Sequence, residues 1–354
     1  MIQASMGFLL AFGYVVGYRF GEKMEETLMF RFGFISDIQY ADIDDAMNFS
    51  KTEHRGYRDA LHHVKKAVSF WNSQVPLPAF VVQVGDIIDG QNSGTYGQGV
   101  SFSAPQSNAA FLRVIAQLEK SMAPVYHVIG NHELYNFSWQ ELRALGNRMD
   151  GRHTIAKEEM FFSFRPHKAW CCIVLNSYAV SIMQDEKSEG YAEAHRILSQ
   201  RNNNFLSQGK KDYFEGLVGR ERRFVPFNGG LGEKQCRWLK NELATCRRLG
   251  EKVLIFVHNP LHAGAASDKN LAFDDDVVME ILHEHGAENV MGVFAGHYHR
   301  GGYVQDEEGI HHLTIQSPLT HGECFGFVDV YSNRMEIHGQ GAHRSHICHF
   351  GVNR

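Results

Sequence analysis

Two histidines, His297 and His299, lie one residue apart between an apolar run and paired glycines in the stretch VFAGHYHRGG (293–302). Imidazole is a common metal ligand, but a chain with 21 histidines contains such pairs by chance. Other apolar runs of this chain also end in side chains that can bind metal: Asp37 and Gln39, Asp86 and Asp89, Asn131 and His132, and His258. Together these carboxylate, amide and imidazole groups have the chemistry to hold two divalent cations and activate water.

Asp86 is the candidate for a shared ligand. Two cations held roughly 3.5–4 Å apart repel each other and need an anion between them, and a carboxylate can bridge them. We predict that the first cation is completed by Asp37, Gln39 and His299, and the second by Asn131, His258 and His297. Mixed oxygen and imidazole ligation favours manganese, iron or zinc, whereas an all-carboxylate cage would favour calcium or magnesium.

Residues beside these groups have candidate roles in the reaction. His132 is the best candidate to stabilise the transition state or to protonate the departing oxygen. Asp89 is expected to orient His132 or a ligand rather than to bind metal itself, and Glu133 is expected to be structural. Phe49 can stack on a nucleobase or simply pack, and Arg300 can reach a phosphate or lie on a solvated rim. The sequence leaves these last two alternatives open.

Two other histidine groups are not expected to bind metal. His343, His346 and His349 form a tract near the C-terminus, but no second cluster with zinc-finger spacing accompanies it. His311 and His312 lie in a strand-like stretch. Serine-hydrolase chemistry is disfavoured because no GxSxG motif occurs, and the chain contains neither a Walker A motif nor GxGxxG.

The elements that must position these groups alternate between strand-like and helical patterns. Apolar runs cover residues 29–36, 79–85, 125–130, 171–176, 252–257 and 289–296. Helical periods cover residues 57–72, 108–122, 233–249 and 275–286. This alternation predicts an α/β fold with buried central strands, and after residue 300 short strands predict a mixed or second sheet. Because ligands bind beyond the carboxyl ends of such strands, the metal-capable groups are expected to converge.

The composition is that of an ordinary globular protein. The chain of 354 residues is 44% hydrophobic and 21% charged, with a formal net charge of −5. This charge gives no reason to expect nucleic acid or an acidic membrane as a partner, so an anionic substrate would need local positive charge such as metal ions. The 6 cysteines show no paired spacing, which is typical of reduced cytosolic thiols. We therefore expect a cytoplasmic protein, with a monomer as the default.

The domain organisation is expected to be simple. Residues 7–18 are apolar but too few to span a bilayer as a helix, and no basic segment precedes them. Residues 1–28 are interpreted as a poorly ordered extension and residues 29–354 as one domain. Residues 184–232 lack a clear period and are expected to form a long insertion that faces the substrate.

The ordered blocks D-x-Q, GDxxDG, GNHE, HNP and GHxH together resemble the calcineurin-like metallophosphoesterase superfamily. They run from Asp37 to His299, which is most of the chain. The resemblance implies a β-sandwich flanked by helices on both faces. One departure is Gln39, which stands where the superfamily pattern has histidine. An amide oxygen is a weaker ligand than imidazole, so the first cation is expected to bind less tightly.

The stretches FISDIQYAD, HNP and GHYHRGGY are similar to the manganese-dependent ADP-ribose/CDP-alcohol diphosphatases. This resemblance implies hydrolysis of the pyrophosphate bond of ADP-ribose, to AMP and ribose 5-phosphate, and of CDP-choline and related CDP-alcohols, to CMP and the phosphoalcohol. Manganese is the expected cation, with magnesium or zinc as alternatives. A phosphomonoesterase or protein phosphatase, or a non-catalytic scaffold of the same fold, are the competing hypotheses.

Overall fold

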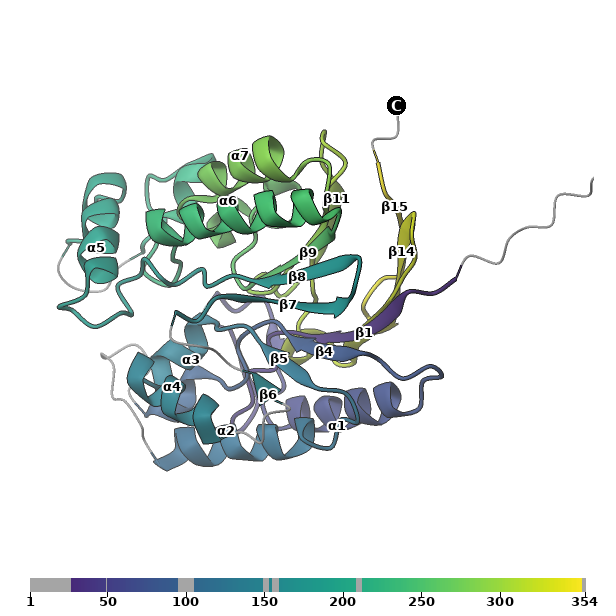
Figure 1. Ribbon diagram of the computed structural model, residues 1–354. Helices are drawn as coiled ribbons and strands as arrows, with labels where there is room; N and C mark the ends of the chain where they lie inside the picture. Colours follow the sequence, from purple (N-terminus) through teal and green to yellow (C-terminus); the bar gives the residue numbers. More distant parts are fainter. Residues whose placement is uncertain are drawn as a thin grey trace, which may run out of the picture.

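Two stacked β-sheets form the centre of the computed structural model, which describes residues 27–48, 50–94, 105–148, 153–154, 159–207 and 212–351. Figure 1 shows the sheets as the two middle layers, with helices above and below them. This arrangement confirms the sandwich flanked by helices on both faces. The expected extension falls almost entirely in residues 1–26, which lie outside the described residues, as does Phe49.

The first sheet has the order β15-β14-β13-β1-β4-β5-β6. Its parallel part consists of β1 (Phe30–Ile35), β4 (Phe80–Gln83), β5 (Val125–His127) and β6 (His153–Thr154). Its antiparallel part consists of β13 (Cys324–Val330), β14 (Arg334–Gly341) and β15 (His346–His349). The carboxyl ends of β1, β4 and β5 therefore point to the same edge of the sheet.

The second sheet has the order β11-β12-β10-β9-β8-β7. Its parallel strands are β8 (Trp170–Val174), β9 (Lys252–Val257), β10 (Val290–Ala295) and β12 (His311–Thr314). The strands β7 (Phe162–His167) and β11 (Gly302–Gln305) pair antiparallel at the two edges. The short strands after residue 300 thus divide between both sheets. A separate hairpin pairs β2 (Ala46–Met47) with β3 (His54–Arg55).

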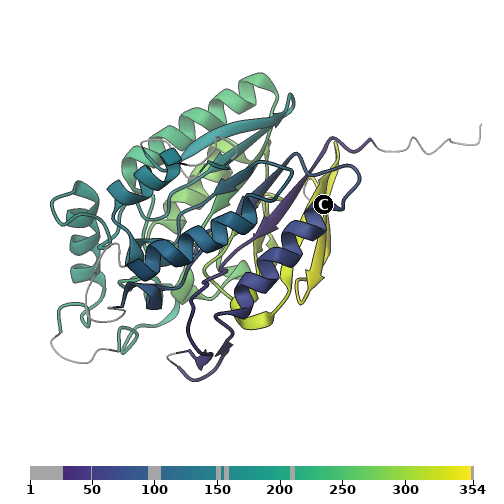
Figure 2. The same ribbon diagram turned by 90° about the horizontal axis from the view of Figure 1, so that it is seen from below.

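The helices cover the outer faces of the two sheets. Over the first sheet lie α1 (Asp59–Asn72), α2 (Pro105–Leu118), α3 (Asn131–Asn136) and α4 (Trp139–Arg148), and Figure 2 shows α1 and α2 side by side. Over the second lie α6 (Gly232–Leu249) and α7 (Asp275–Gly286), while α8 (Pro318–His321) is a single turn before β13. Short 3₁₀ turns are η1 (Gly90–Ser93), η2 (Gly219–Arg223), η3 (Ala263–Ala265) and η4 (Asp268–Asn270). No helix in the described part of the chain is long and apolar enough to cross a membrane.

Aromatic side chains fill the space between the sheets. The Phe32 ring stacks on Phe80 of the same sheet with 5.0 Å between centroids, and it meets Phe256 and Phe294 of the other sheet edge-on at 5.6 and 5.4 Å. All four rings are buried. Burying each such side chain contributes about 2–3 kcal/mol, so this layer fixes one sheet against the other.

The expected insertion contains a helix that the sequence did not predict. The helix α5 (Glu189–Arg201) begins at Ser188, whose side chain accepts a hydrogen bond from the Tyr191 amide. Its only buried side chains are Ala194 and Leu198, one turn apart, which pack in a small cluster with other residues of the insertion. A helix that buries so narrow a stripe leaves little periodic signal in the sequence, which explains why residues 184–232 look irregular.

Candidate metal centre

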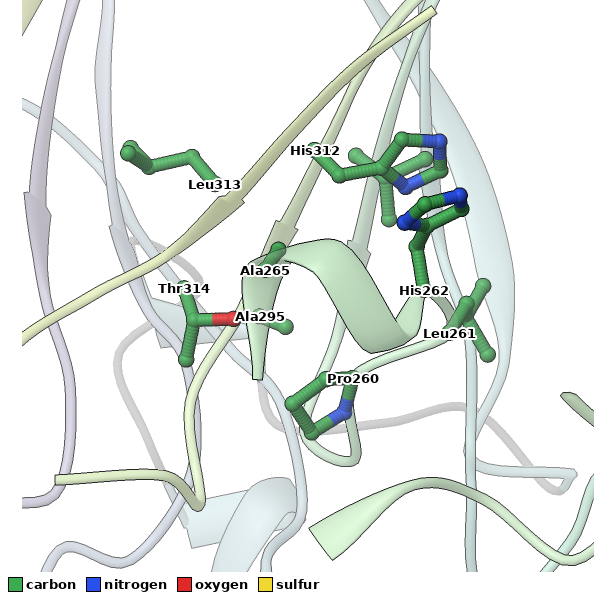
Figure 3. A pocket seen from close by; sticks show the side chains of 9 residues that line it. Pro260, Leu261, His262, Ala265, Ala295, His312, Leu313 and Thr314 are labelled. Atoms are coloured by element: carbon green, nitrogen blue, oxygen red, sulfur yellow. The ribbon is translucent and has the colours of Figure 1, made fainter. Parts of the chain in front are cut away.

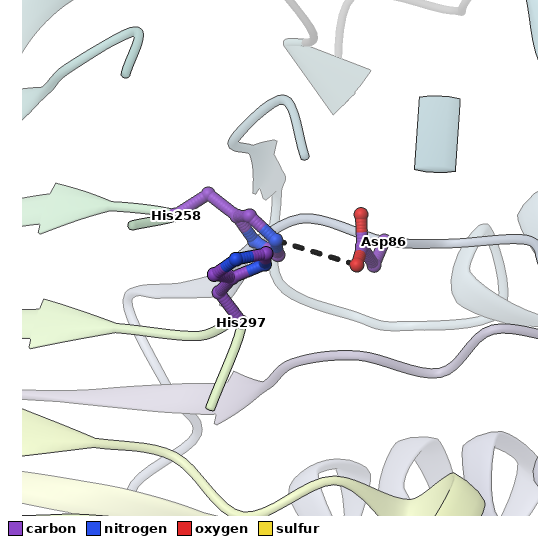
Figure 4. A group of neighbouring side chains, drawn as sticks. All are labelled: Asp86, His258 and His297. Carbon is purple, nitrogen blue, oxygen red and sulfur yellow. Dashed lines mark ion pairs between the residues drawn. The ribbon is translucent and has the colours of Figure 1, made fainter. Parts of the chain in front are cut away.

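The predicted metal-binding groups meet at the edge where the carboxyl ends of both sheets come together. Asp37 and Gln39 follow β1, Asp86 follows β4 and Asn131 follows β5, all in the first sheet. His258 follows β9, and His297 and His299 follow β10, in the second sheet. Figure 4 shows the rings of His258 and His297 side by side, facing Asp86. One ligand atom from each of these three residues lies within 4.8 Å of the other two.

A chain of short contacts connects these groups. The Gln39 amide nitrogen donates to Asp86 Oδ2 at 2.9 Å and lies 3.0 Å from His299 Nε2. His299 Nε2 is 3.5 Å from Asp37 Oδ1, and His258 Nε2 is 3.3 Å from Asp86 Oδ2. Four of these five side chains are almost completely buried, and His299 is largely so. Asp86 therefore lies between the two sets of groups, as its predicted bridging role requires.

Asn131 and His297, the remaining two predicted ligands, are each oriented by a hydrogen bond to a residue outside the ligand set. Asn131 Oδ1 accepts a hydrogen bond from the Tyr178 hydroxyl at 3.1 Å. His297 Nε2 lies 2.8 Å from Asn228 Oδ1; because that oxygen can only accept, Nε2 carries a proton and Nδ1 retains its lone pair. Tyr178 and Asn228 were missed in the sequence, where neither residue stands in a motif.

The backbone is strained where the predicted ligands lie. Asp37, Gln39, Asp86 and His297 have φ values of 51°, 45°, 60° and 64°, in the left-handed region that side chains other than glycine seldom adopt. A residue held there costs on the order of 1 kcal/mol or more and persists only when its surroundings enforce it. Strain concentrated at these positions marks the edge as a functional site.

Two motif glycines leave room for the ligands. A Cβ atom at Gly85 would lie 2.2 Å from His258 Nδ1, and one at Gly130 would lie 2.1 Å from Asp86 Oδ1. Gly85 also has a φ of +92°. Any side chain at either position would displace a predicted ligand, which is the physical reason for glycine in GDxxDG and GNHE.

Among the predicted ligands, two buried atoms make no hydrogen bond within the described residues: Gln39 Oε1, and His258 Nε2, whose neighbour is Asp86 Oδ2 at 3.3 Å. The His258 ring is oriented by Nδ1, which donates to the Val84 carbonyl at 2.8 Å, so Nε2 faces Asp86 and would offer a lone pair to a cation once it gives up its proton. Leaving a buried acceptor unpaired costs about 1–3 kcal/mol unless another group satisfies it. Divalent cations fit this requirement, and the amide oxygen and imidazole nitrogen are suitable ligands.

Burial and neighbouring charges shift the pKa values of the predicted ligands in different directions. Burial raises the pKa of Asp37 to about 7, although the His258 charge acts against this. Burial also disfavours the charged form of Asp86, but His258 and then His132 hold its pKa well below the ordinary value. Burial would lower the pKa of His258, yet Asp86 raises it to about 9. For His297, burial and then the His258 charge lower the pKa to about 3, so this imidazole stays neutral and able to bind a cation.

His132 lies beside the predicted bridge rather than within the ligand set. Its Nδ1 accepts a hydrogen bond from the Gly90 amide at 2.9 Å, so the neutral ring carries its proton on Nε2, which lies 3.9 Å from Asp86 Oδ2. Asp89 Oδ2 is 3.4 Å from His132 Nδ1, close enough to stabilise a protonated ring. The Gly90 backbone amide thus orients the ring.

Glu133 ties the loops of the site together. Its carboxylate accepts hydrogen bonds from three backbone amides: Asp86 at 2.9 Å, Ile87 at 2.5 Å and Gly130 at 2.8 Å. These amides belong to the loops that follow β4 and β5. The geometry is that of the structural role expected for Glu133, because every contact positions backbone.

Other candidate residues lie outside this cluster. Arg300 is exposed, and its guanidinium pairs with Glu53 at 2.7 Å. The C-terminal histidines diverge: His343 packs against Phe34, and His346 stacks on Tyr303 with ring centroids 4.2 Å apart. The insertion supplies a neighbour that the sequence did not reveal, since the Phe227 ring lies 6.3 Å from that of His297.

A separate narrow pocket lies behind the loop that carries His258 (Figure 3). It is lined by Pro260, His262, His312 and Thr314, among others, and the His262 and His312 rings stack with 4.9 Å between centroids. The pocket is too narrow to hold a water molecule. It therefore offers no second ligand site beside the candidate metal centre.

Comparisons with known proteins identify the family of this chain. The sequence profile of the calcineurin-like phosphoesterases matches residues 30–301. Manganese-dependent ADP-ribose/CDP-alcohol diphosphatases from Danio rerio and Arabidopsis thaliana are 34% and 35% identical to this chain, over 89% and 88% of it and 97% and 94% of their own lengths. The human protein of that name is 31% identical over 92% of this chain and 94% of its own length.

A solved structure agrees with these matches. The crystal structure of a dimetal phosphatase from Danio rerio superposes with a TM-score of 0.81 at 33% identity, covering 92% of this chain and all of the other (100%). Profile, relatives and fold agree over the stretch that contains every predicted ligand. The chain belongs to the calcineurin-like phosphoesterase family and, within it, to the manganese-dependent ADP-ribose/CDP-alcohol diphosphatases.

Proposed function

We infer that the protein is a metal-dependent hydrolase of nucleotide diphosphates. Its substrates are ADP-ribose, cleaved to AMP and ribose 5-phosphate, and CDP-alcohols such as CDP-choline, CDP-ethanolamine and CDP-glycerol, cleaved to CMP and the phosphoalcohol. The family to which the chain belongs supports this reaction. The observation that carries it is the convergence of carboxylate, amide and imidazole groups from both sheets on one edge.

Two divalent cations, with manganese as the activating ion, would be held by residues of both sheets. Asp86 would bridge them, with Asp37, Gln39 and His299 on one side and Asn131, His258 and His297 on the other. When bound, the cations neutralise the phosphoryl charge and supply a water molecule activated at neutral pH. Gln39 Oε1, a buried acceptor without a hydrogen-bond partner among the described residues, supports this assignment.

His132 would act on the leaving group. The Gly90 amide holds the neutral ring with Nε2 toward Asp86. To act as an acid the ring would first take a proton on Nδ1, in exchange for the Gly90 contact, and the imidazolium would then give its Nε2 proton to an oxygen that departs near Asp86. Asp89, 3.4 Å from Nδ1, would stabilise the ring when it is protonated. This arrangement favours protonation of the departing phosphate oxygen over removal of a proton from water.

The insertion would provide the wall that contacts the nucleotide. Phe227 lies beside His297, and its ring is 5.9 Å from that of Phe214. Arg222 lies over the Phe214 ring at 5.2 Å, and Lys269 at 6.0 Å. Aromatic faces with two cations nearby suit a base or ribose joined to phosphates. Arg300 is already paired with Glu53, so a phosphate contact there would require that pair to open.

The chain is proposed to act alone as one domain in the cytoplasm. All predicted ligands come from one chain, which supports a monomer, and no partner is needed to complete the site. The net charge of −5 supports neither nucleic acid nor an acidic membrane as a partner. The free state of all 6 cysteines agrees with a reducing compartment.

Product analysis tests the function directly. The purified chain is freed of metal, supplied with Mn²⁺, Mg²⁺ or Zn²⁺, and given ADP-ribose or CDP-choline while AMP or CMP is measured. We expect release of both nucleotides with Mn²⁺. Cleavage of p-nitrophenyl phosphate or a phosphoprotein alone would favour a phosphomonoesterase or protein phosphatase, and no turnover at all would favour a scaffold.

His132→Gln is the matched test of the proposed acid. Glutamine fills a similar volume and can still accept from the Gly90 amide, but it cannot transfer a proton. We expect kcat to fall by about 10²–10⁴-fold with little change in Mn²⁺ affinity. A loss that appears only in metal affinity would instead make His132 part of the ligand set.

A further inference from the structure

A second cluster of metal-binding side chains lies on the outer face of the second sheet. Cys171 on β8 and Glu242 and Cys246 on α6 have ligand atoms that all lie within 4.8 Å of one another. Glu242 and Cys246 are four residues apart, so they lie on the same face of α6. Both thiols are buried, and the Glu242 side chain is 17% exposed, which leaves an entry for an ion from solvent.

The separations suit a small cation bound by sulfur. Cys171 Sγ lies 3.8 Å from Glu242 Oε1. In a tetrahedral zinc site, bonds of about 2.3 Å to sulfur and about 2.1 Å to oxygen place the two ligand atoms about 3.6 Å apart. The same geometry places two sulfurs about 3.8 Å apart, and the Cys171 and Cys246 sulfurs lie within 4.8 Å of each other. Only small side-chain adjustments would be needed.

Neighbouring groups orient the carboxylate. Glu242 Oε1 accepts a hydrogen bond from the Ser163 hydroxyl at 2.7 Å and another from Arg165 at 3.2 Å. Arg165 in turn donates two hydrogen bonds to Glu251, at 2.8 and 3.1 Å. Partners of this kind commonly fix the ligands of a metal site and supply part of its charge balance.

We propose that Cys171, Cys246 and Glu242 bind one thiophilic divalent cation of the zinc and cadmium class. Each thiol would lose its proton when the cation binds. Two protons would therefore leave for each divalent cation bound, and the net charge of the site would not change. The neighbouring thiol and burial raise the pKa of Cys246, so without such a cation the Cys246 thiol remains protonated. A bound ion would link α6 to β8.

This site is distinct from the candidate metal centre. Cys171 pairs with Val253 at the amino end of β9, whereas His258 follows the carboxyl end of the same strand. Five residues of extended chain separate Val253 from His258, which is about 16 Å. None of the predicted ligands of the metal centre is a cysteine, so thiolate spectroscopy reports on the second site alone.

Cadmium titration tests the proposal. The reduced, Mn²⁺-loaded chain is titrated with Cd²⁺ while the ultraviolet thiolate-to-cadmium charge-transfer band is recorded. We expect a band that saturates at one equivalent per chain, disappears in Cys246→Ser and is unchanged in Cys236→Ser, a buried cysteine of the same helix. Zn²⁺ should compete and abolish it. No band in the native chain, or the same band in Cys246→Ser, would overturn the proposal.

A more conservative variant, Glu242→Gln, controls for loss of the band through a folding defect. Glu242→Gln retains both thiols and the volume of the side chain, so the band should persist while the Cd²⁺ dissociation constant rises at least about tenfold. ADP-ribose hydrolysis with Mn²⁺ should be unchanged in this variant. An unaltered Cd²⁺ affinity in Glu242→Gln would remove the carboxylate from the site and with it the proposed ligand set.

Discussion

Glu133 is expected to have a structural role and no chemical role in the reaction. The Glu133→Gln variant tests this expectation. The carboxylate accepts hydrogen bonds from the amides of Asp86, Ile87 and Gly130 in a fully buried position. Glutamine has one oxygen instead of two, so at least one amide loses its acceptor and faces an NH₂ group. Hydrogen bonds to charged groups contribute about 1.5–3 kcal/mol each, and an unpaired buried amide costs a similar amount.

We therefore expect Glu133→Gln to lower the free energy of unfolding by about 2–4 kcal/mol. Urea denaturation in the presence of a chelator measures this loss without a contribution from metal binding. Because Asp86 and Gly130 lose a shared anchor, the Mn²⁺ concentration needed for half-maximal activity should rise. At saturating Mn²⁺, kcat should remain within about tenfold of the native value, since no atom of Glu133 is assigned to the reaction.

The control for this experiment is Glu119→Gln, the same change at an exposed position after α2, which should alter stability by less than about 0.5 kcal/mol. The reasoning fails if Glu133→Gln unfolds like the native chain but loses 10³-fold or more of kcat at saturating Mn²⁺. That result would place the carboxyl among the acids and bases of the reaction.

Three further outcomes can be measured. Asp86→Ala removes the proposed bridge and should abolish binding of both Mn²⁺ ions by equilibrium dialysis, with near-total loss of turnover; wild-type rates would refute the bridge. Gln39→His introduces an imidazole and should lower the Mn²⁺ concentration needed for half-maximal activity. A higher Mn²⁺ requirement than that of the native chain would contradict the ligand assignment. Burial, and then the His346 charge, lower the pKa of His343 to about 4. As the pH falls below about 6.5, His343 therefore becomes protonated in the unfolded chain but stays neutral in the folded chain, which destabilises the folded state. His343→Phe should therefore remove on the order of 3 kcal/mol of acid destabilisation between pH 7 and 4 in urea titrations, and an unchanged pH dependence would show that His343 is already solvated when folded.

Because their patterns are unambiguous, the sequence predicted the central strands and the helices α1, α2, α6 and α7, but not α5. β9 is a continuous apolar run, and α6 and α7 repeat apolar residues at helical spacing. The convergence of the metal-capable groups followed from the same reading, since parallel strands align their carboxyl ends. What the motif blocks could not supply was the left-handed backbone at Asp37 and Asp86, whose amides donate to the Gly85 carbonyl and to Glu133 in neighbouring loops of the first sheet.

Residues that act through tertiary contacts were harder to find. Asn228 orients His297 from 69 positions away in the chain, and Tyr178 contacts Asn131 from 47 positions away. Neither residue lies in a block with recognisable spacing, and Asn228 belongs to the insertion whose pattern is irregular. A single sequence carries no signal for a pair of this kind, because any polar residue is compatible with a surface loop until the fold brings the partner close.

The division of the ligands between the sheets has a physical consequence for the proposed centre. Each predicted cation would be held by groups from both sheets: His299 would join Asp37 and Gln39 at the first, and Asn131 would join His258 and His297 at the second. Asp86 comes from the first sheet but pairs with His258 of the second. The aromatic layer that separates the sheets therefore sets the spacing between the predicted ligands of one sheet and those of the other. A rigid, close-packed interior gives such a centre a fixed width, and strained loops then bring the side chains to it.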